Sequence, residues 1–232
     1  MITVKIAELA IGIDNRYEYV KTLASDYLTD ETPLFTVVAT DAELEEERAR
    51  TEIEFSNGYL ESIVVYRKIA EILPKYDAFV FHGAILNYNG EAYAFTARSG
   101  VGKTTHTRLW LQEFSGDVHY LNGDKPIIRI IDGKPYAAGT PWRGKENYGV
   151  NEMAPLKGIA LLDRGEKNTA QQIDTAVAVL RLVSQIYLPT EREAVHLTMR
   201  LADKIIRSVR FIELKCNMDR EAAHIARKAL IY

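Results

Sequence analysis

The chain has 232 residues, of which 47% are hydrophobic and 26% are charged, and its formal net charge is −3. This apolar content excludes a disordered chain, because it is sufficient for one large core or for a core with a small appendage. A net charge so close to zero gives no bulk field that would draw the molecule onto nucleic acid or an anionic membrane, so we expect neither as a partner.

Cysteine usage and the apolar pattern favour the cytoplasm. Cys216 is the one cysteine, which excludes an internal disulfide, and the N-terminal segment lacks the basic start and long apolar stretch of a signal peptide. No uncharged apolar run approaches the roughly 20 residues that a helix needs to cross a bilayer. We therefore expect a cytoplasmic protein that does not span a membrane.

Residues 1–75 are predicted to form a small, strand-rich N-terminal region with one helix. The segments 2–6 and 35–39 are β-rich and are separated by turn-prone dipeptides. Residues 62–73 repeat apolar side chains at helical spacing, and a proline follows directly. Between them, residues 41–54 contain seven acids and two arginines, which we interpret as a solvated surface rather than a metal site.

Residues 76–232 are predicted to form a second domain that begins with β-hairpins. Two β-type runs, 78–88 and 91–97, meet at Asn89-Gly90, a dipeptide suited to the positive φ angles of a tight hairpin turn. A second hairpin is indicated around Asp132-Gly133, and a buried strand at 158–162. Hairpins at this density favour an α/β fold with a mixed sheet over an all-parallel one.

The C-terminal third of the chain is predicted to be largely helical. Thr190 and Glu193 stand in capping-box register and would open a helix. The apolar residues on one face of this helix are Ala194, Leu197, Leu201 and Ile205. A strand at 209–214 and a helix after Asp219 would close the chain.

A phosphate-binding loop, or P-loop, is the strongest motif in the sequence. The segment Ala97-Arg98-Ser99-Gly100-Val101-Gly102-Lys103-Thr104 fits its pattern, with alanine in place of the usual first glycine. Small residues let successive backbone N–H groups turn toward phosphate oxygens, the lysine reaches the terminal phosphates, and the hydroxyl ligates Mg²⁺. A strand is expected before the loop and a helix after it, with its positive dipole end toward the anion. The residues expected to hold ATP are Ser99, Gly100, Val101, Gly102, Lys103, Thr104 and Thr105.

Two further residues are candidates for the chemistry. The strand at 118–121 ends in Asn122-Gly123-Asp124, and we expect Asp124 to hold Mg²⁺ together with Thr104. His82 ends the strand that we expect to pair with the one feeding the loop, which would place its imidazole near the γ-phosphate. A purely structural histidine is an equally good interpretation. The other histidines show no zinc-ligand spacing: His106, His119, His196 and His224.

A glycine-rich segment, residues 139–149, carries two cations that suit a clamp on an anionic group. These are Arg143 and Lys145, and both are assigned to the catalytic set with His82 and Asp124. A solvated turn is the alternative for this segment.

These motifs together resemble a known family, the catalytic domain of HPr kinase/phosphorylase. The resemblance rests on His82-Gly83, the hairpin, SGVGKTT, the strand ending in Asp124, and the 15 positions from residue 82 to residue 97. It is specific over 79–124, weaker to about 165, and does not cover the N-terminal region. It implies the fold shared by HPr kinase and phosphoenolpyruvate carboxykinase. Small bacterial proteins with SGxGKTTHTRLW, DKP and GTPW-GKE blocks are similar throughout, and some relatives phosphorylate serines on peptides made in modification clusters.

The sequence departs from the family pattern at two places. The family's loop begins with glycine and ends Lys-Ser-Glu, whereas this loop begins with Ala97 and ends Lys103-Thr104-Thr105. The family's strand ends in two adjacent aspartates, the first of which acts as base toward the acceptor hydroxyl, whereas this strand ends in Gly123-Asp124. The family's C-terminal signature for phosphorolysis is not recognised, so phosphorylase activity is not expected.

Three functions compete on these grounds. The leading one is an ATP- and Mg²⁺-dependent kinase that transfers the γ-phosphoryl group to a hydroxyl, on serine or threonine of a peptide or small protein. The second is a nucleotide-binding regulatory protein that has lost transfer, which Gly123 favours. The third is a small-molecule phosphotransferase of carboxykinase type, for which no carboxylate-binding site can be located.

Overall fold

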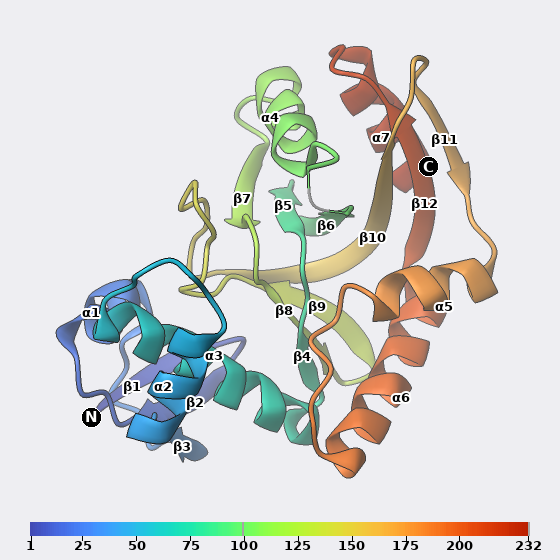
Figure 1. Cartoon of the computed structure of the whole chain (residues 1–232). Coiled ribbons are helices and arrows are strands. Elements are labelled where there is room, and N and C mark those ends of the chain that lie inside the picture. The colour runs from blue at the N-terminus through green and yellow to red at the C-terminus, as the bar shows by residue number, and fades with distance from the viewer. Residues whose placement is uncertain (99, 232) are drawn as a thin grey trace.

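Two sheets organise the chain, one of three strands and one of nine (Figure 1). The computed structural model describes residues 1–98 and 100–231, so Ser99, one of the residues assigned to the phosphate loop, lies outside the described residues. The three-stranded sheet belongs to the N-terminal region, and the larger sheet contains both parallel and antiparallel pairs. The expected mixed α/β architecture is therefore confirmed.

The N-terminal region contains three α-helices where the sequence indicated one. Its sheet has the order β1-β2-β3, with β1 and β2 antiparallel and β2 and β3 parallel. Its elements are β1 (Ile2–Ile6), β2 (Leu9–Ile13), α1 (Glu18–Leu23), a 3-10 turn (Ser25–Tyr27), β3 (Phe35–Val37), α2 (Asp41–Ala49), α3 (Asn57–Ile72) and a 3-10 turn (Leu73–Tyr76).

Local capping explains the unexpected helix α2 and the early start of α3. The acidic segment forms α2 because Thr40 and Glu43 make a reciprocal capping box, with Thr40 N donating to Glu43 Oε2 at 2.8 Å. Leu44 is the buried residue of α2, so the helix leaves almost no apolar periodicity in the sequence. Helix α3 starts five residues before the expected position, because the Ser56 side chain accepts from Tyr59 N.

The nine-stranded sheet has the order β4-β8-β9-β10-β6-β5-β7, and β12 pairs with β10 and carries β11. Its strands are β4 (Ala78–Val80), β5 (Ala84–Tyr88), β6 (Glu91–Thr96), β7 (Val118–Asn122), β8 (Ile127–Ile131), β9 (Lys134–Ala138), β10 (Met153–Arg164), β11 (Thr169–Gln172) and β12 (Arg210–Cys216). Both predicted hairpins are present. Their turns have φ of 52° and 84° at Asn89-Gly90, and 49° and 76° at Asp132-Gly133.

Strand β10 joins two halves of this sheet. Its first residues pair antiparallel with β9, whereas the rest of the strand lies parallel to β6 and β12, with a register shift between Leu156 and Gly158. One half therefore contains β4, β8 and β9, and the other contains β5, β6, β7, β11 and β12. Besides β10 itself, two connections carry the chain between the halves, one from β4 to β5 and one from β7 to β8.

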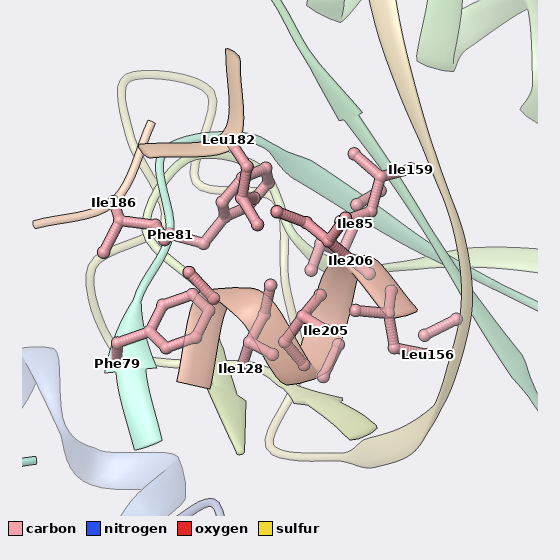
Figure 2. Close-up of a cluster of buried hydrophobic side chains, with 14 of the residues drawn as sticks. Phe79, Phe81, Ile85, Ile128, Leu156, Ile159, Leu182, Ile186, Ile205 and Ile206 are labelled. Carbon is pink, nitrogen blue, oxygen red and sulfur yellow. The ribbon is translucent and has the colours of Figure 1, made fainter. Parts of the chain in front are cut away.

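Helices cover both faces of the second half because its strands alternate apolar side chains to the two sides. Ala94 of β6 and Ile159 of β10 face the cluster built with α5 (Thr175–Val183) and α6 (Arg192–Ser208). Figure 2 shows this cluster, with Ile205 and Ile206 of α6 among the side chains of the sheet. Phe95 and Ala160 face the opposite cluster, built with α4 (Lys103–Glu113) and α7 (Glu221–Ile231).

The expected capping box of Thr190 and Glu193 is wrong. Helix α6 begins at Arg192, and Glu191 occupies the cap position without a side-chain cap hydrogen bond. Thr190 instead donates from its backbone N and its hydroxyl to Glu71 Oε2, at 2.8 and 3.2 Å. This contact crosses 119 positions of sequence, so no local pattern could reveal it. No helix in the described part of the chain is long and apolar enough to cross a membrane.

Candidate active site

The two connections between the halves of the large sheet bring His82 and Asp124 together. His82 lies between β4 and β5, and Asp124 lies between β7 and β8. Because β4 pairs with β8 and β5 pairs with β7, the two connections run side by side. Gly83 N donates to Asp124 O at 3.0 Å and links them directly. The expected pairing of the strand before His82 was wrong, since β4 pairs with β8 and it is β5 that pairs with β6.

Asn122 fixes the turn that presents Asp124. Its side-chain Oδ1 accepts from the backbone N of Asp124 and of Lys125, both at 2.8 Å. Its Nδ2 donates to the carbonyl and hydroxyl oxygens of Thr140, each at 3.1 Å, and the residue is fully buried. An asparagine at the end of a strand is a known turn signal, but sequence reasoning did not assign it this positioning role.

The Asp124 carboxylate lies against a histidine and a lysine. Its Oδ1 is 3.4 Å from His82 Nε2, and its Oδ2 is 3.9 Å from Lys125 Nζ. Burial alone would raise the pKa of the Asp124 carboxyl, but the hydrogen bond with His82 and the charges of Lys125 and Lys103 outweigh it and lower the pKa. The carboxylate is therefore charged at neutral pH, as a metal ligand must be.

The predicted phosphate loop connects β6 to α4, as expected. Gly100 and Gly102 have φ of 77° and 123°, angles that favour glycine, and a Cβ at Gly100 would meet nothing within 4 Å. Conformation rather than lack of space therefore requires glycine at this position. Gly102 is also the N-cap of α4, so the residue at the cap position offers no side chain to the first-turn N–H groups of the helix. Such a helix start is suited to an anion.

Lys103 stands at the first position of α4 and is half-buried. Its Nζ donates to Ala97 O at 3.3 Å, across the loop. Burial lowers the pKa of the Lys103 ammonium, whereas the Asp124 carboxylate raises it, so the two side chains act on each other electrostatically. Thr104 is half-buried and Thr105 is exposed in the same turn.

Arg164 is a loop contact that sequence reasoning missed. It lies at the end of β10, where its Nη2 donates to Gly100 O at 2.6 Å and its Nε to Val101 O at 3.5 Å. The contact joins positions 64 residues apart, and nothing in the local sequence around Arg164 marks it.

The structure places Arg143 and Lys145 differently from each other. Arg143 Nη2 donates to Asp26 Oδ2 at 2.7 Å, its guanidinium lies 5.7 Å from the Tyr27 ring centroid, and its side chain is only 13% exposed. Arg143 thus ties the glycine-rich segment to the N-terminal region. Lys145 is exposed, and it lines the same cleft as Asp124.

The backbone around Gly123 leaves little room for a side chain. A Cβ at this position would lie 3.1 Å from Arg143 O and 3.3 Å from Tyr148 O, and Gly123 N donates to Tyr148 O at 2.8 Å. A second carboxylate beside Asp124 would therefore face two carbonyl oxygens, which repel it.

The glycine-rich segment also packs directly on Asp124. A Cβ at Gly144 would lie 2.8 Å from Asp124 Cβ. The cleft lined by Asp124 and Lys145 has a volume of about 1070 Å³ and lies between α3 and residues 141–147. Of the four catalytic candidates, His82 and Asp124 are in contact with each other, and Lys145 lines the same cleft as Asp124. Arg143 forms an ion pair with Asp26.

Comparison with known proteins identifies no close relative. No family model matches the sequence, and no curated protein sequence matches it. Among solved structures, an HPr(Ser) kinase/phosphatase from Coxiella burnetii matches with a TM-score of 0.37 and 8% sequence identity. The match covers 64% of this chain and 94% of that chain.

Proposed function

We propose that this protein is an ATP- and Mg²⁺-dependent kinase that transfers the γ-phosphoryl group to a hydroxyl of a peptide or small protein. One observation supports the proposal: the Asp124 carboxylate lies 3.4 Å from His82 Nε2 and interacts electrostatically with Lys103, which follows the loop between β6 and α4. The pKa of Asp124 responds to both His82 and Lys103. Phosphoryl transfer needs these parts, a cradle for phosphates and a carboxylate for the metal, next to each other.

The nucleotide would lie with its phosphates on the loop and the start of α4. Positive φ at Gly100 and Gly102 lets backbone N–H groups of the loop turn toward the phosphates, and the 11-residue helix α4, which has glycine at its N-cap, adds the partial positive charge of its N-terminus. Lys103, now bonded to the Ala97 carbonyl, has a phosphate oxygen as its stronger alternative acceptor, because a charge-assisted bond between two ions exceeds one to a neutral carbonyl.

The described residues fit magnesium rather than a metal held by protein alone. Mg²⁺ prefers hard oxygen ligands and binds through one or two carboxylates together with substrate phosphates. Among the described residues no group of three His, Cys, Asp or Glu side chains gathers at one point. Asp124 and the Thr104 hydroxyl would therefore supply the protein ligands. When bound, the ion would neutralise charge on the phosphates.

His82 is the candidate acceptor for the hydroxyl proton. In the transfer, the acceptor oxygen bonds to the γ-phosphorus, the bond from that phosphorus to the β,γ-bridging oxygen breaks, and ADP leaves. The proton of the hydroxyl passes to the His82 imidazole, whose resulting charge the Asp124 carboxylate at 3.4 Å stabilises. Positioning supplies most of the acceleration in such a loose transition state, so a single carboxylate is sufficient.

A nucleotide-binding regulatory protein without transfer is the second candidate. The observation that favours it is the crowding at Gly123, where the carbonyls of Arg143 and Tyr148 exclude a second carboxylate. Under this function ATP and Mg²⁺ would bind, but no acceptor would be phosphorylated.

Calorimetric titration of Mg-ATP into Lys103→Ala tests the nucleotide site. Loss of a charge-assisted contact worth about 1.5–3 kcal/mol should weaken binding at least about tenfold. Thr104→Ala should weaken binding only when Mg²⁺ is present. The matched control is Lys134→Ala, an exposed lysine of β9, which should bind as the wild type does. If Lys103→Ala and wild type bind Mg-ATP with equal affinity, the proposed binding of the phosphates by this loop is wrong.

Incubation with γ-labelled ATP and serine-containing peptides separates the two candidates. The kinase transfers label to peptide, and Asp124→Asn abolishes this transfer. If wild type binds Mg-ATP with the expected dependence on Lys103 but labels no peptide, the regulatory function replaces the kinase.

A further inference from the structure

The cleft beside Asp124 is much larger than transfer to a small alcohol requires. Its volume of about 1070 Å³ is at the top of the range of about 300–1,000 Å³ typical of pockets for small ligands. One wall comes from the N-terminal region, chiefly α3 and the residues before it, and the other from residues 141–147. The volume leaves room for several residues of a peptide next to the carboxylate.

Four aromatic side chains line the wall from the N-terminal region: Tyr19, Phe55, Tyr59 and Tyr66. Phe55 and Tyr59 stack with ring centroids 4.6 Å apart, and Tyr19 meets Tyr59 edge-on at 6.1 Å. In the same cleft, the ring centroids of Tyr66 and Trp142 lie 5.4 Å apart. Rings held against one another present a rigid apolar surface, which binds an aromatic or large aliphatic side chain at low entropic cost.

The glycine-rich segment is fastened across this surface. Trp142 Nε1 donates to Ser62 O of α3 at 3.1 Å, and Arg143 pairs with Asp26. Both anchors join the segment to the N-terminal region, so the two walls of the cleft have a fixed spacing. A groove already formed in the free protein binds a peptide without the entropic cost of ordering its walls.

The charge of the cleft is predominantly positive. Five cations line it against two acids; the cations are Arg50, Arg67, Lys125, Arg143 and Lys145, and the acids are Glu47 and Asp124. Glu47 is shared by Arg50 and Arg67, at 3.8 and 3.0 Å. Lys145 has no carboxylate within 4.0 Å among residues 1–98 and 100–231. The positive charge that remains without a partner therefore lies on the segment that contacts Asp124.

We propose that this cleft is the acceptor site, and that its ligand is an extended peptide segment carrying an acidic residue and an aromatic or large aliphatic residue close to the hydroxyl that is phosphorylated. The inference rests on the proposed function only in taking Asp124 as the place of transfer. The acidic side chain meets Lys145, and the apolar side chain packs on Tyr59 and its neighbours. Complementary charge then fixes the register of the peptide and favours acidic over basic acceptors.

Pools of fluorescein-labelled heptapeptides with a central serine test the site without ATP. One pool carries acidic and aromatic residues beside the serine, a second replaces the acids by lysine, and a third replaces the aromatics by alanine. We expect the first pool to bind at least about tenfold tighter than either other pool by fluorescence anisotropy, the size of one charge-assisted or aromatic contact.

Two variants assign the preference to the cleft. Lys145→Glu should abolish the advantage of acidic over lysine peptides, and Tyr59→Ala should abolish the advantage of aromatic over alanine peptides. The matched controls are Lys134→Glu and Tyr136→Ala of β9, which lie outside the cleft and should keep both preferences. Circular dichroism spectra of all four variants establish that they fold.

The outcomes separate this inference from the kinase. Equal binding of the three pools, binding of none, or preferences that survive both cleft variants overturns the acceptor site, even if label from ATP is transferred to peptides. Binding with the expected preferences supports the site, even if no label is transferred; in that case it is the kinase function that fails.

Discussion

Protonation of His106 is expected to destabilise the protein as the pH falls below about 6.5. His106 lies in the second turn of α4 and is 2% exposed. Its Nε2 accepts from Trp110 Nε1 at 3.1 Å, and its ring lies 5.2 Å from that of Phe95. Burial lowers the pKa of this imidazole from 6.5 to about 4, so the folded protein holds His106 neutral. The helix it anchors is the one that would hold the phosphates.

The direction of the effect follows from proton binding in the two states. In the unfolded chain His106 takes up a proton near pH 6.5, whereas in the folded protein it does so only near pH 4. Between these values the unfolded state binds more protons, so the free energy of unfolding falls with falling pH. The stabilisation is fully present above pH 6.5. At about 1.4 kcal/mol for each pH unit, about 2 kcal/mol is lost by pH 5.

Urea unfolding of wild type and His106→Gln at pH 7.5 and 5.0 measures this contribution. Glutamine can still accept from Trp110 Nε1 but does not titrate, so the difference in unfolding free energy between the two proteins should change by about 2 kcal/mol between the two pH values. His196→Gln, at an exposed position of α6, is the control and should follow the wild type. Parallel loss of stability in wild type and His106→Gln would refute the reasoning.

Two further predictions concern the turn that carries Asp124. Gly123→Asp should lower the unfolding free energy by about 1–3 kcal/mol, because its Cβ would press on the carbonyls of Arg143 and Tyr148; an unchanged melting temperature would contradict the crowding. Asn122→Ala removes the acceptor of two backbone N–H groups at 2.8 Å. This variant should lower the free energy of unfolding by roughly 2–3 kcal/mol and weaken Mg²⁺-dependent ATP binding. Asn122→Asp keeps that acceptor but turns an oxygen instead of Nδ2 toward Thr140 O, so it should lose stability as well and yet retain more Mg²⁺-dependent ATP binding than Asn122→Ala; equal losses of ATP binding in the two variants would remove the positioning role.

The sequence by itself determined the features that near neighbours fix. Asn89-Gly90 and Asp132-Gly133 specified their hairpins because these residues adopt positive φ at little cost, whatever they later contact. The same holds for the glycines of the loop between β6 and α4 and for the start of α4 at Lys103. The helical apolar spacing located most of α6, whose buried side chains include Leu201 and Ile205.

Contacts between distant segments were decided only by the tertiary structure. His82 meets Asp124 because β4 pairs with β8 while β5 pairs with β7, an arrangement that depends on how the whole sheet assembles. Arg143 pairs with Asp26, and Arg164 contacts the loop at Gly100, across 117 and 64 positions of sequence. A charged side chain has several possible partners in an unfolded chain, and the packing of the core selects which one it reaches. Local residue preferences therefore determined the turns and the glycine positions of the loop before α4, whereas the burial of apolar faces between sheet and helices determined which side chains meet in the candidate site.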